Sequence, residues 1–397
     1  MILRTSILAS LLTASVASAV AQVKEGPIER HRGYWTQELS GSIPAPIRLT
    51  ISATGDVRVR GANVDRVSFR VVRKVKASSE EEARRIFERG ALQMSRRGPA
   101  ATLNLDDPAC GRCAFFAEIE VETPHTLREA VLTTRAGAIE AVGISGGVSV
   151  NSAAGSIHLS AIGGSVRAET AGGNIDLGQI GGPVRCETAG GSISLDQSGG
   201  EATLSSNGGK ITVGTVSGAL RAETLGGDIE AQKVGGRVTA STFGGSIHIG
   251  EADGEVIADT AGGSIEVARA GHGVRAETPN GDILLTEVAG RIYATTLSGS
   301  VQAHFVSGRP LANSLIETTG GAIVIWLPAD IRIAIDAQVD FAGGGGRIES
   351  EFPAIVVNAE EEGFGPRAMR ASGELNGGGP TLTIRNTSGK ILIRRRQ

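Results

Sequence analysis

Apolar and polar residues alternate in short runs over residues 137–308, and the runs recur every 18 residues. One half of the repeat carries a column of isoleucines, from Ile139 to Ile283, with a second apolar residue two positions later. The other half carries a mostly valine column, from Val148 to Val274, followed at two-residue steps by a small residue and by Thr or Ser. Alternation with period two predicts one short strand in each half, with all of these columns facing inward. Large side chains on one sheet then meet small ones on the other, which fills a thin core without voids.

A glycine grid divides the repeat into its halves. Glycine occupies nineteen of the twenty positions spaced nine residues apart between Gly137 and Gly308, and His272 is the exception. Because glycine takes φ > 0 without strain, we expect these residues to form the corners between strands. Parallel strands of successive repeats then stack about 4.8 Å apart. The sequence therefore predicts an all-β fold, a parallel β-solenoid with 18-residue rungs made of two nine-residue halves.

The first residues are typical of a signal peptide. Arg4 precedes a short uncharged apolar run that ends in small residues. This run is shorter than the roughly 20 residues that span a bilayer, so we expect no transmembrane segment in the mature chain. The net charge of −3 gives no basis for binding nucleic acid or an anionic membrane surface. The protein is therefore expected to be exported, and to be periplasmic, on the cell surface or secreted.

The segments on either side of the repeat do not share its period. The first contains β-like runs and one helix, expected over about 79–96, whose start carries a capping box of Ser79 and Glu82. The last contains isoleucine pairs at irregular spacing, as expected where a solenoid must cover its open end. The expected organisation is a signal peptide over 1–21, a small β-rich region over 22–135, the regular solenoid over 136–308, and irregular rungs with a cap over 309–397.

The three cysteines fall into two groups. Cys110 and Cys113 form a C-x-x-C pair, which in an exported protein favours a local disulfide or an incidental thiol pair. A redox role is disfavoured, because that motif needs a helix start beside a βαβ unit. Cys186 occupies a small-residue position of the valine half and is predicted to be a buried thiol.

Charged residues form two columns on the outward face of the valine half, with each Arg two residues before an acid. One interpretation is a solvated ladder of ion pairs that keeps the sheet soluble, and exposed pairs of this kind are common. The other is a ladder that faces a ligand, such as a glycan or another envelope polymer. The pairs are Arg167 and Glu169, Arg185 and Glu187, Arg221 and Glu223, and Arg275 and Glu277.

Candidate catalytic and metal-binding motifs are weak. Residues 143–147 match G-x-S-x-G, but that motif requires a strand–elbow–helix context, so we interpret the match as chance. No two His residues have the spacing of metal ligands, and the calcium-binding nonapeptide pattern is broken, so no metal or cofactor is expected. An enzyme acting on a polysaccharide would need two converging carboxyls. The acids of the irregular C-terminal region that could supply them are Asp336, Asp340, Glu349 and Glu351.

The tandem G-G-x-I-x-L and G-G-x-V-x-A-x-T units, with the lead-in 118–124 and the closing motifs 318–323 and 387–391, resemble the bacterial putative-adhesin domain family. The resemblance covers roughly residues 45–397 and implies an exported β-solenoid of the cell envelope. The family offers no catalytic residues to carry over. The helix near Ser79 and the C-x-x-C loop depart from the family pattern.

Three functions follow as hypotheses. The first is an exported, non-enzymatic, adhesin-like solenoid that binds or scaffolds at the cell envelope, with a polysaccharide or a protein as partner. The second is a carbohydrate-active β-helix enzyme with its site in the irregular C-terminal rungs. The third is a structural rod that assembles with itself. Specificity is expected where the grid fails, at His272 and at the two ends.

Overall fold

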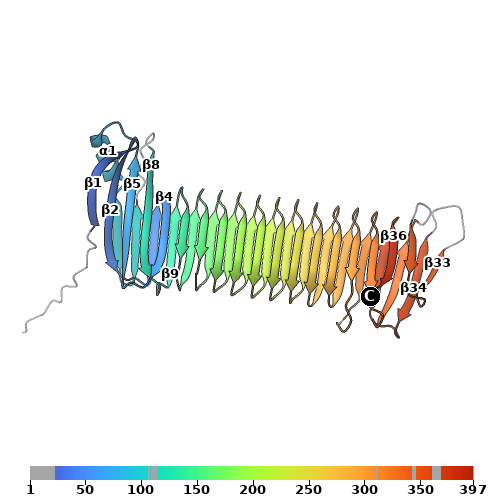
Figure 1. The fold of residues 1–397 in the computed structure, drawn as a ribbon. Coiled ribbons are helices and arrows are strands. Elements are labelled where there is room, and N and C mark those ends of the chain that lie inside the picture. The colour runs from blue at the N-terminus through green and yellow to red at the C-terminus, as the bar shows by residue number, and fades with distance from the viewer. Residues whose placement is uncertain are drawn as a thin grey trace, which may run out of the picture.

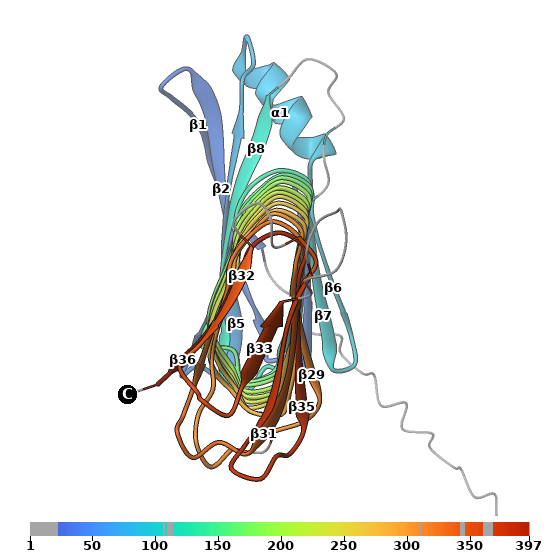
Figure 2. The ribbon, with the colours of Figure 1, turned by 90° about the vertical axis from the view of Figure 1, so that its right-hand side faces the viewer.

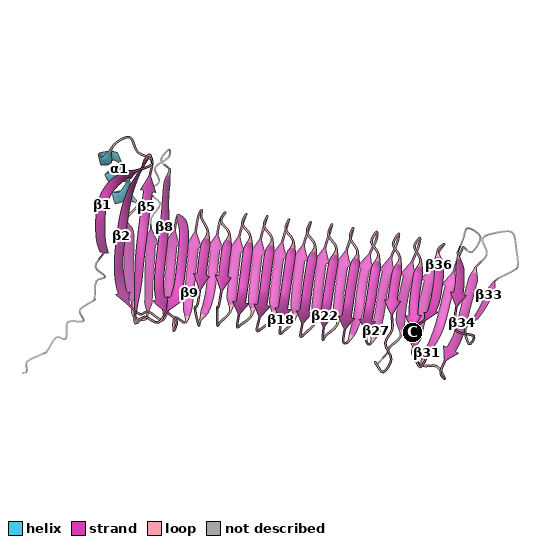
Figure 3. Ribbon diagram, viewed as in Figure 1, coloured by secondary structure: helices cyan, strands magenta, loops and turns pink. Residues whose placement is uncertain are grey.

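Successive repeats pair in parallel and in register, with an offset of 18 residues. Ile157 lies opposite Ile175 in one sheet, and Val166 lies opposite Val184 in the other. A computed structural model describes residues 23–105, 108, 114–309, 311–341, 346–359 and 368–396. It shows a long rod with one helix near its N-terminal end (Figures 1 and 3). The predicted all-β parallel solenoid with 18-residue rungs is confirmed, whereas the signal peptide, Cys110 and Cys113 lie outside the described residues.

The isoleucine halves form one sheet, called sheet A here. Each strand begins at the isoleucine column, or at its valine equivalent in the last rung. In the regular region this sheet contains β10 (Ile139–Val142), β12 (Ile157–Ser160), β14 (Ile175–Ile180), β16 (Ile193–Ser198), β18 (Ile211–Val216), β20 (Ile229–Val234), β22 (Ile247–Ala252), β24 (Ile265–Ala270), β26 (Ile283–Val288) and β28 (Val301–His304).

The valine halves form the second sheet, called sheet B. Its strands end at the Thr or Ser column. They are β9 (Glu129–Thr134), β11 (Gly147–Ser152), β13 (Val166–Thr170), β15 (Val184–Thr188), β17 (Ala202–Ser206), β19 (Leu220–Thr224), β21 (Val238–Thr242), β23 (Val256–Thr260), β25 (Gly273–Thr278) and β27 (Arg291–Thr296).

The core lies between the two sheets and is as thin as the residue columns predict. Ile175, Val166 and Ala168 are each exposed by 2 % or less. Cys186 is fully buried at a small-residue position, as predicted. A fully buried Ile or Val side chain contributes about 2 kcal/mol relative to an exposed one. Although the core is only two side chains thick, every rung adds such buried side chains, and together they stabilise the rod.

The grid glycines are required by close stacking of the rungs. Their backbone is left-handed at only three grid positions, Gly137, Gly290 and Gly308, so the expected general need for φ > 0 is wrong. A Cβ atom on Gly227 would instead lie 2.2 Å from the carbonyl oxygen of Gly209 in the preceding rung. Any side chain at such a position collides with backbone, which explains the nine-residue grid better than local conformation does.

The exception in the grid changes the corner locally. The imidazole Nδ1 of His272 lies 2.8 Å from the carbonyl oxygen of Asp253. The following residue, Gly273, takes φ +122°, and β25 begins there, one residue before the valine column. The one side chain on the grid is therefore accompanied by a left-handed glycine directly after it.

The solenoid begins before the regular repeat. Strands β3 (Arg48–Ala53) and β4 (Gly55–Ala62) pair in parallel with β9 and β10, so they form a rung. On their other side lie β7 (Ala100–Leu105) and β8 (Phe115–Pro124), again in parallel. The solenoid therefore begins before the expected boundary at residue 136. The first rung along the rod is β7 with β8, and the second is β3 with β4, which precedes it in the chain.

Antiparallel strands cover the N-terminal end of both sheets. In sheet A, β8 is followed by β5 (Arg66–Val75), β2 (Tyr34–Pro44) and β1 (Val23–His31). In sheet B, β7 is covered by β6 (Leu92–Arg97). The edge strand β1 contains Pro27 and an irregular register, and β6 carries the exposed Arg96 and Arg97. Proline, bulges and charges at an edge disfavour further strand pairing, so this end does not favour open-ended assembly.

The helix is shorter than the sequence indicated. Helix α1 spans Glu80–Arg89, and the Ser79 side chain accepts a hydrogen bond from the Glu82 backbone as the capping box predicts. The expected extension to residue 96 is wrong, because Gly90 caps the helix and the following residues pair with β7 as strand β6. Nη1 of the buried Arg73 donates to the carbonyls of Phe87 and Gly90, both at 2.8 Å, which fixes the helix end on the sheet.

The C-terminal rungs also depart from chain order. After β29 (Ser314–Thr318) and β30 (Ile323–Leu327), the next rung is formed by β35 (Thr381–Asn386) and β36 (Lys390–Arg395). The outermost rung is β31 (Ile333–Val339) and β32 (Arg347–Ser350). The antiparallel strands β34 (Met369–Leu375) and β33 (Val356–Ala359) extend sheet B beyond it. The view from this end shows the flattened cross-section of the coil, with α1 projecting beyond the rungs (Figure 2).

Candidate ligand-binding surfaces

The predicted charge ladder lies on the outer face of sheet B. Its residues come from β13, β15, β19 and β25. The Arg and the Glu of each strand lie on the same face, because they are two residues apart. Each Arg forms an ion pair with the Glu of its own strand, as with Arg275 and Glu277 at 2.6 Å. The Arg side chains are 53–57 % exposed and the Glu side chains 31–44 % exposed. The other pairs are Arg167 with Glu169, Arg185 with Glu187, and Arg221 with Glu223.

Three of the four acids of the ladder also line two open hollows beside the Thr corner. The first, of about 370 Å³, contains Glu169 and Glu187 together with amides and hydroxyls. The second, of about 340 Å³, contains Glu277, Glu317 and Tyr293. The Arg275 guanidinium lies over the Tyr293 ring, 5.2 Å from its centroid. Sequence reasoning placed the ladder but not these hollows, because each is lined by side chains of several successive rungs.

Between the two hollows, the column that contains the ladder acids includes an Asp without an Arg on its own strand. Asp259 lies between Ser241 and Glu277 in the column, and its own strand carries Ile257 where the four ladder strands have Arg. Partial burial and then the charge of Glu277 raise the pKa of Asp259, while Arg275 acts in the opposite direction. The ladder is therefore not a uniform series of matched pairs.

An exposed apolar column follows the Thr corner directly. Leu225, Phe243 and Leu297 are 61, 72 and 60 % exposed, and each comes one residue after a buried Thr. In the other rungs this position holds mainly Ala, and three of these Ala residues line the first hollow, whereas Pro279 and Leu297 line the second. We missed this column from the sequence, although its apolar residues recur at the 18-residue period and could have revealed it.

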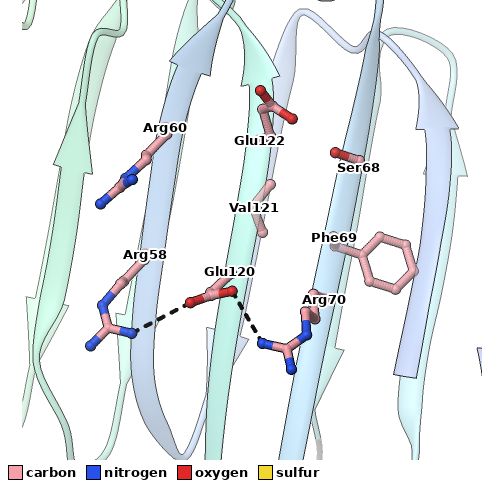
Figure 4. A pocket seen from close by; sticks show the side chains of 8 residues that line it. All are labelled: Arg58, Arg60, Ser68, Phe69, Arg70, Glu120, Val121 and Glu122. Carbon is pink, nitrogen blue, oxygen red and sulfur yellow. Dashed lines mark ion pairs between the residues drawn. The ribbon is translucent and has the colours of Figure 1, made fainter. Parts of the chain in front are cut away.

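A larger hollow of about 520 Å³ lies on the outer face of sheet A, near the N-terminal end (Figure 4). Adjacent strands β4, β5 and β8 supply its lining. The Glu120 carboxylate lies 3.6 Å from Nη1 of Arg58 and 3.5 Å from Nη1 of Arg70. The complete lining is Arg58, Arg60, Ser68, Phe69, Arg70, Glu120, Val121 and Glu122. Sequence reasoning did not find it, because its strands become neighbours only through the changed rung order.

Each of the four C-terminal acids is engaged by an Arg or Gln side chain. Asp336 lies on sheet B and pairs with Arg385 at 2.6 Å, whereas Glu349 lies on sheet A. Glu349 and Glu351 both bind the Arg394 guanidinium, at 3.0 and 3.2 Å. The remaining acid, Asp340, accepts a hydrogen bond from Gln338 at 2.7 Å.

The pKa of Glu351 is shifted away from what a glycosidase general acid needs. A hydrogen bond from the Arg395 backbone and the Arg394 charge lower the pKa of Glu351. A glycosidase general acid requires a raised pKa, so this arrangement resembles an ion-pair cluster more than a hydrolytic site. It gives no specific support to the enzyme hypothesis.

The remaining motifs have structural roles. The G-x-S-x-G segment forms a corner, where the Ser145 N–H donates to the His125 carbonyl at 3.0 Å and strand β11, not a helix, follows. Nδ1 of His248 lies 3.0 Å from the Glu266 carboxylate. Among the described residues, no group of three or more His, Cys, Asp or Glu side chains could hold a metal ion.

Within the same part of the chain, no helix has the length and apolar composition needed to cross a membrane.

The fold and these surfaces define an all-β parallel solenoid with charged outer faces. Among similar solved structures, a putative adhesin from Bacteroides fragilis is 12 % identical, with 72 % of this chain and 95 % of that chain covered and a TM-score of 0.26. A putative adhesin from Parabacteroides merdae is 10 % identical, with 74 % and 97 % covered and a TM-score of 0.26. A putative cell adhesion protein from Clostridium sporogenes is 7 % identical, with 95 % and 100 % covered and a TM-score of 0.16.

These structures bear the putative-adhesin or cell-adhesion description that the sequence motifs also resemble. At such TM-scores the likeness carries no argument about what this chain binds. No protein-family model matches the chain, and no curated protein matches it.

Proposed function

We propose that this protein is an exported, non-enzymatic, adhesin-like solenoid that binds an extended polymer of the cell envelope along the outer face of sheet B. One observation carries the proposal: three of the four acids of the charge ladder, Glu169, Glu187 and Glu277, line the two hollows beside the Thr corner. The apolar column that includes Phe243 runs beside them. Carboxylates, hydroxyls and apolar side chains together suit a polymer with both polar and apolar surfaces, such as a polysaccharide.

The periodicity of the rod matches an extended ligand. A polymer lying along the axis meets equivalent side chains in successive rungs, about 4.8 Å apart. Each exposed contact is individually weak, because exposed charges remain solvated. Several contacts on one rigid scaffold raise the overall affinity through effective concentration. The signal peptide expected over residues 1–21 would bring this face to the envelope.

A pull-down with isolated envelope polysaccharide and cell-wall fractions tests the proposal. We expect the purified mature protein to bind at least one fraction and to release no soluble sugar. The double variant Glu169→Gln/Glu187→Gln should bind at least fivefold less, whereas Glu230→Gln, which disrupts the Lys210–Glu230 pair on sheet A, should bind like the wild type. Absence of wild-type binding to any envelope fraction, or release of sugar products, would overturn the proposal.

A further inference from the structure

The hollow on sheet A is separate from the charge ladder and has the size of a small-ligand site. Its volume of about 520 Å³ falls within the range of roughly 300–1,000 Å³ for such sites. The side chains of Arg58, Arg60, Glu120 and Glu122 stand on neighbouring strands around it (Figure 4). Phe69 and Val121 contribute to the lining from buried positions, with 4 and 3 % exposure. The strand framework holds these groups in fixed positions without a ligand.

The arginines of the hollow retain unused hydrogen-bond donors. Arg58 lies 3.6 Å from Glu120 and 3.7 Å from Glu140, and Arg60 lies 3.8 Å from Glu140. These distances exceed the 2.7–3.2 Å of an N–H···O hydrogen bond, and a guanidinium has five N–H donors. The ladder pair Arg275–Glu277, at 2.6 Å, shows the contrasting closed arrangement.

The hollow also offers unused acceptors. Within the described part of the chain, the Glu122 carboxylate makes no ion pair or hydrogen bond, and its side chain is exposed. By contrast, Glu38 is engaged by Arg70 at 2.8 Å, and this hydrogen bond lowers the pKa of Glu38. An ionised carboxylate accepts several hydrogen bonds and donates none. Free donors on β4 and a free acceptor on β8 therefore line the same hollow.

The balance of charge indicates what kind of ligand fits. Three arginines line the hollow with Glu120 and Glu122, and the adjoining Glu38 and Glu140 add two further negative charges. A strongly anionic or cationic ligand would therefore meet like charges as well as opposite ones. A neutral ligand rich in hydroxyl groups avoids this repulsion, because each hydroxyl donates to a carboxylate and accepts from a guanidinium.

We infer that this hollow binds an uncharged saccharide unit, held by Arg58, Arg60 and Glu122. The inference relies on the proposed envelope function only for the source of the saccharide. Because the hollow lies on sheet A and the ladder on sheet B, the two sites can be occupied independently. One molecule could then hold a polymer along one face and a compact saccharide on the other.

Titration calorimetry with matched trisaccharides tests the inference. The probes are a neutral hexose, an N-acetylhexosamine, a uronate and a hexosamine trisaccharide. We expect saturable binding of at least one of the two neutral probes, with at least tenfold weaker binding by the folded variants Arg60→Gln and Glu122→Gln. Arg237→Gln, which disrupts an exposed ion pair elsewhere on the rod, should retain the wild-type affinity.

The outcomes separate this inference from the proposed function. Binding of charged probes alone, binding of no probe, or wild-type affinity in both hollow variants would overturn the saccharide site. If neutral saccharide binds but no envelope fraction is retained, the proposed function fails and this inference stands. If Glu169→Gln/Glu187→Gln loses binding to the envelope fractions and the hollow variants leave saccharide binding unchanged, the proposed function stands and this inference fails. Circular dichroism of each variant confirms that the solenoid is folded.

Discussion

The Thr224 hydroxyl donates a hydrogen bond to the carbonyl oxygen of Gly209 in the preceding rung, at 2.9 Å. The same hydroxyl lies 3.3 Å from the Gly227 N–H, from which it accepts a hydrogen bond. Thr224 is 5 % exposed, and equivalent bonds recur along the Thr column, as at Thr188 and Thr242. A buried polar column is therefore satisfied rung by rung, and it joins each corner to the one before it.

Replacement of Thr224 by Val is expected to lower the free energy of unfolding by about 1–3 kcal/mol. The substitution keeps the shape of the side chain but leaves the Gly209 carbonyl and the Gly227 N–H without their hydroxyl partner. Guanidinium denaturation followed by circular dichroism measures the change. Thr203→Val, on the outer face of sheet B, should change stability by less than about 0.5 kcal/mol. Equal effects of the two variants would contradict the role of the hydroxyl.

Two adjacent glycines should respond very differently to alanine. A Cβ on Gly227 would lie 2.2 Å from the Gly209 carbonyl oxygen, whereas a Cβ on Gly226 would lie 3.5 Å from that of Gly208. Gly227→Ala is therefore expected to cost about 3 kcal/mol or more, since backbone atoms must move apart. Gly226→Ala should change stability by no more than about 1 kcal/mol. Thermal denaturation of both variants checks this, and a similar loss at both positions would refute the stacking explanation.

The Cys186 thiol is expected to be unreactive in the folded protein. Burial raises its pKa from an ordinary value of 9.0 to about 12, so the reactive thiolate is scarce at pH 8. In a Cys110→Ser/Cys113→Ser background, a thiol reagent should modify Cys186 only after denaturation. Rapid labelling of the native protein would show that the core around β15 opens readily.

The same shift predicts how stability depends on alkaline pH. The folded pKa lies above the unfolded one, so the thiol contributes its full stabilisation below about pH 9 and loses it progressively towards about pH 12. Cys186→Ala should therefore lose less stability over this range than the wild type. Parallel pH titrations of the melting temperature measure the difference, and identical slopes would contradict it.

Asp259→Asn is expected to stabilise the protein slightly at pH 7. Burial and the Glu277 charge raise the pKa of Asp259, so its ionised form is disfavoured in the folded state. The stability associated with the protonated form is present at acid pH and is lost as pH rises through the folded pKa. Because the side chain is partly exposed, a gain of about 0.3 kcal/mol is expected at pH 7, and none at pH 3. Calorimetry at both pH values tests this, with Ser241→Asn as a control.

The charge ladder was predictable, but the hollow on sheet A was not. Arg167 and Glu169 are two residues apart, so strand periodicity alone places them on one face. Arg58, Arg70 and Glu120 come from three separate strands, and β8 must lie between β4 and β5 before they meet. Nothing in the local sequence specifies that order, since the pairing depends on contacts between distant segments.

The helix illustrates the same limit. Ser79 and Glu82 fixed its start because a capping box acts within one turn. Its end was misjudged because Met94, which fits the apolar face of a longer helix, instead pairs with Leu103 in sheet B. Pairing with strand β7 outweighed the local helical pattern, and only the tertiary structure brings β7 beside this segment.

The sequence by itself determined the 18-residue rung, the inward and outward faces of residues such as Ile157 and Arg167, and the glycine grid. These features repeat, and each rung meets a near copy of itself, so one period encodes every contact in the regular region. The tertiary structure alone decided the order of rungs at both ends and the clearance that makes glycines such as Gly227 necessary. The strands at the ends have no repeated copies to pair with, so the repeat does not specify their partners. The clearance is a distance between two rungs, so it cannot be derived from the sequence of one strand.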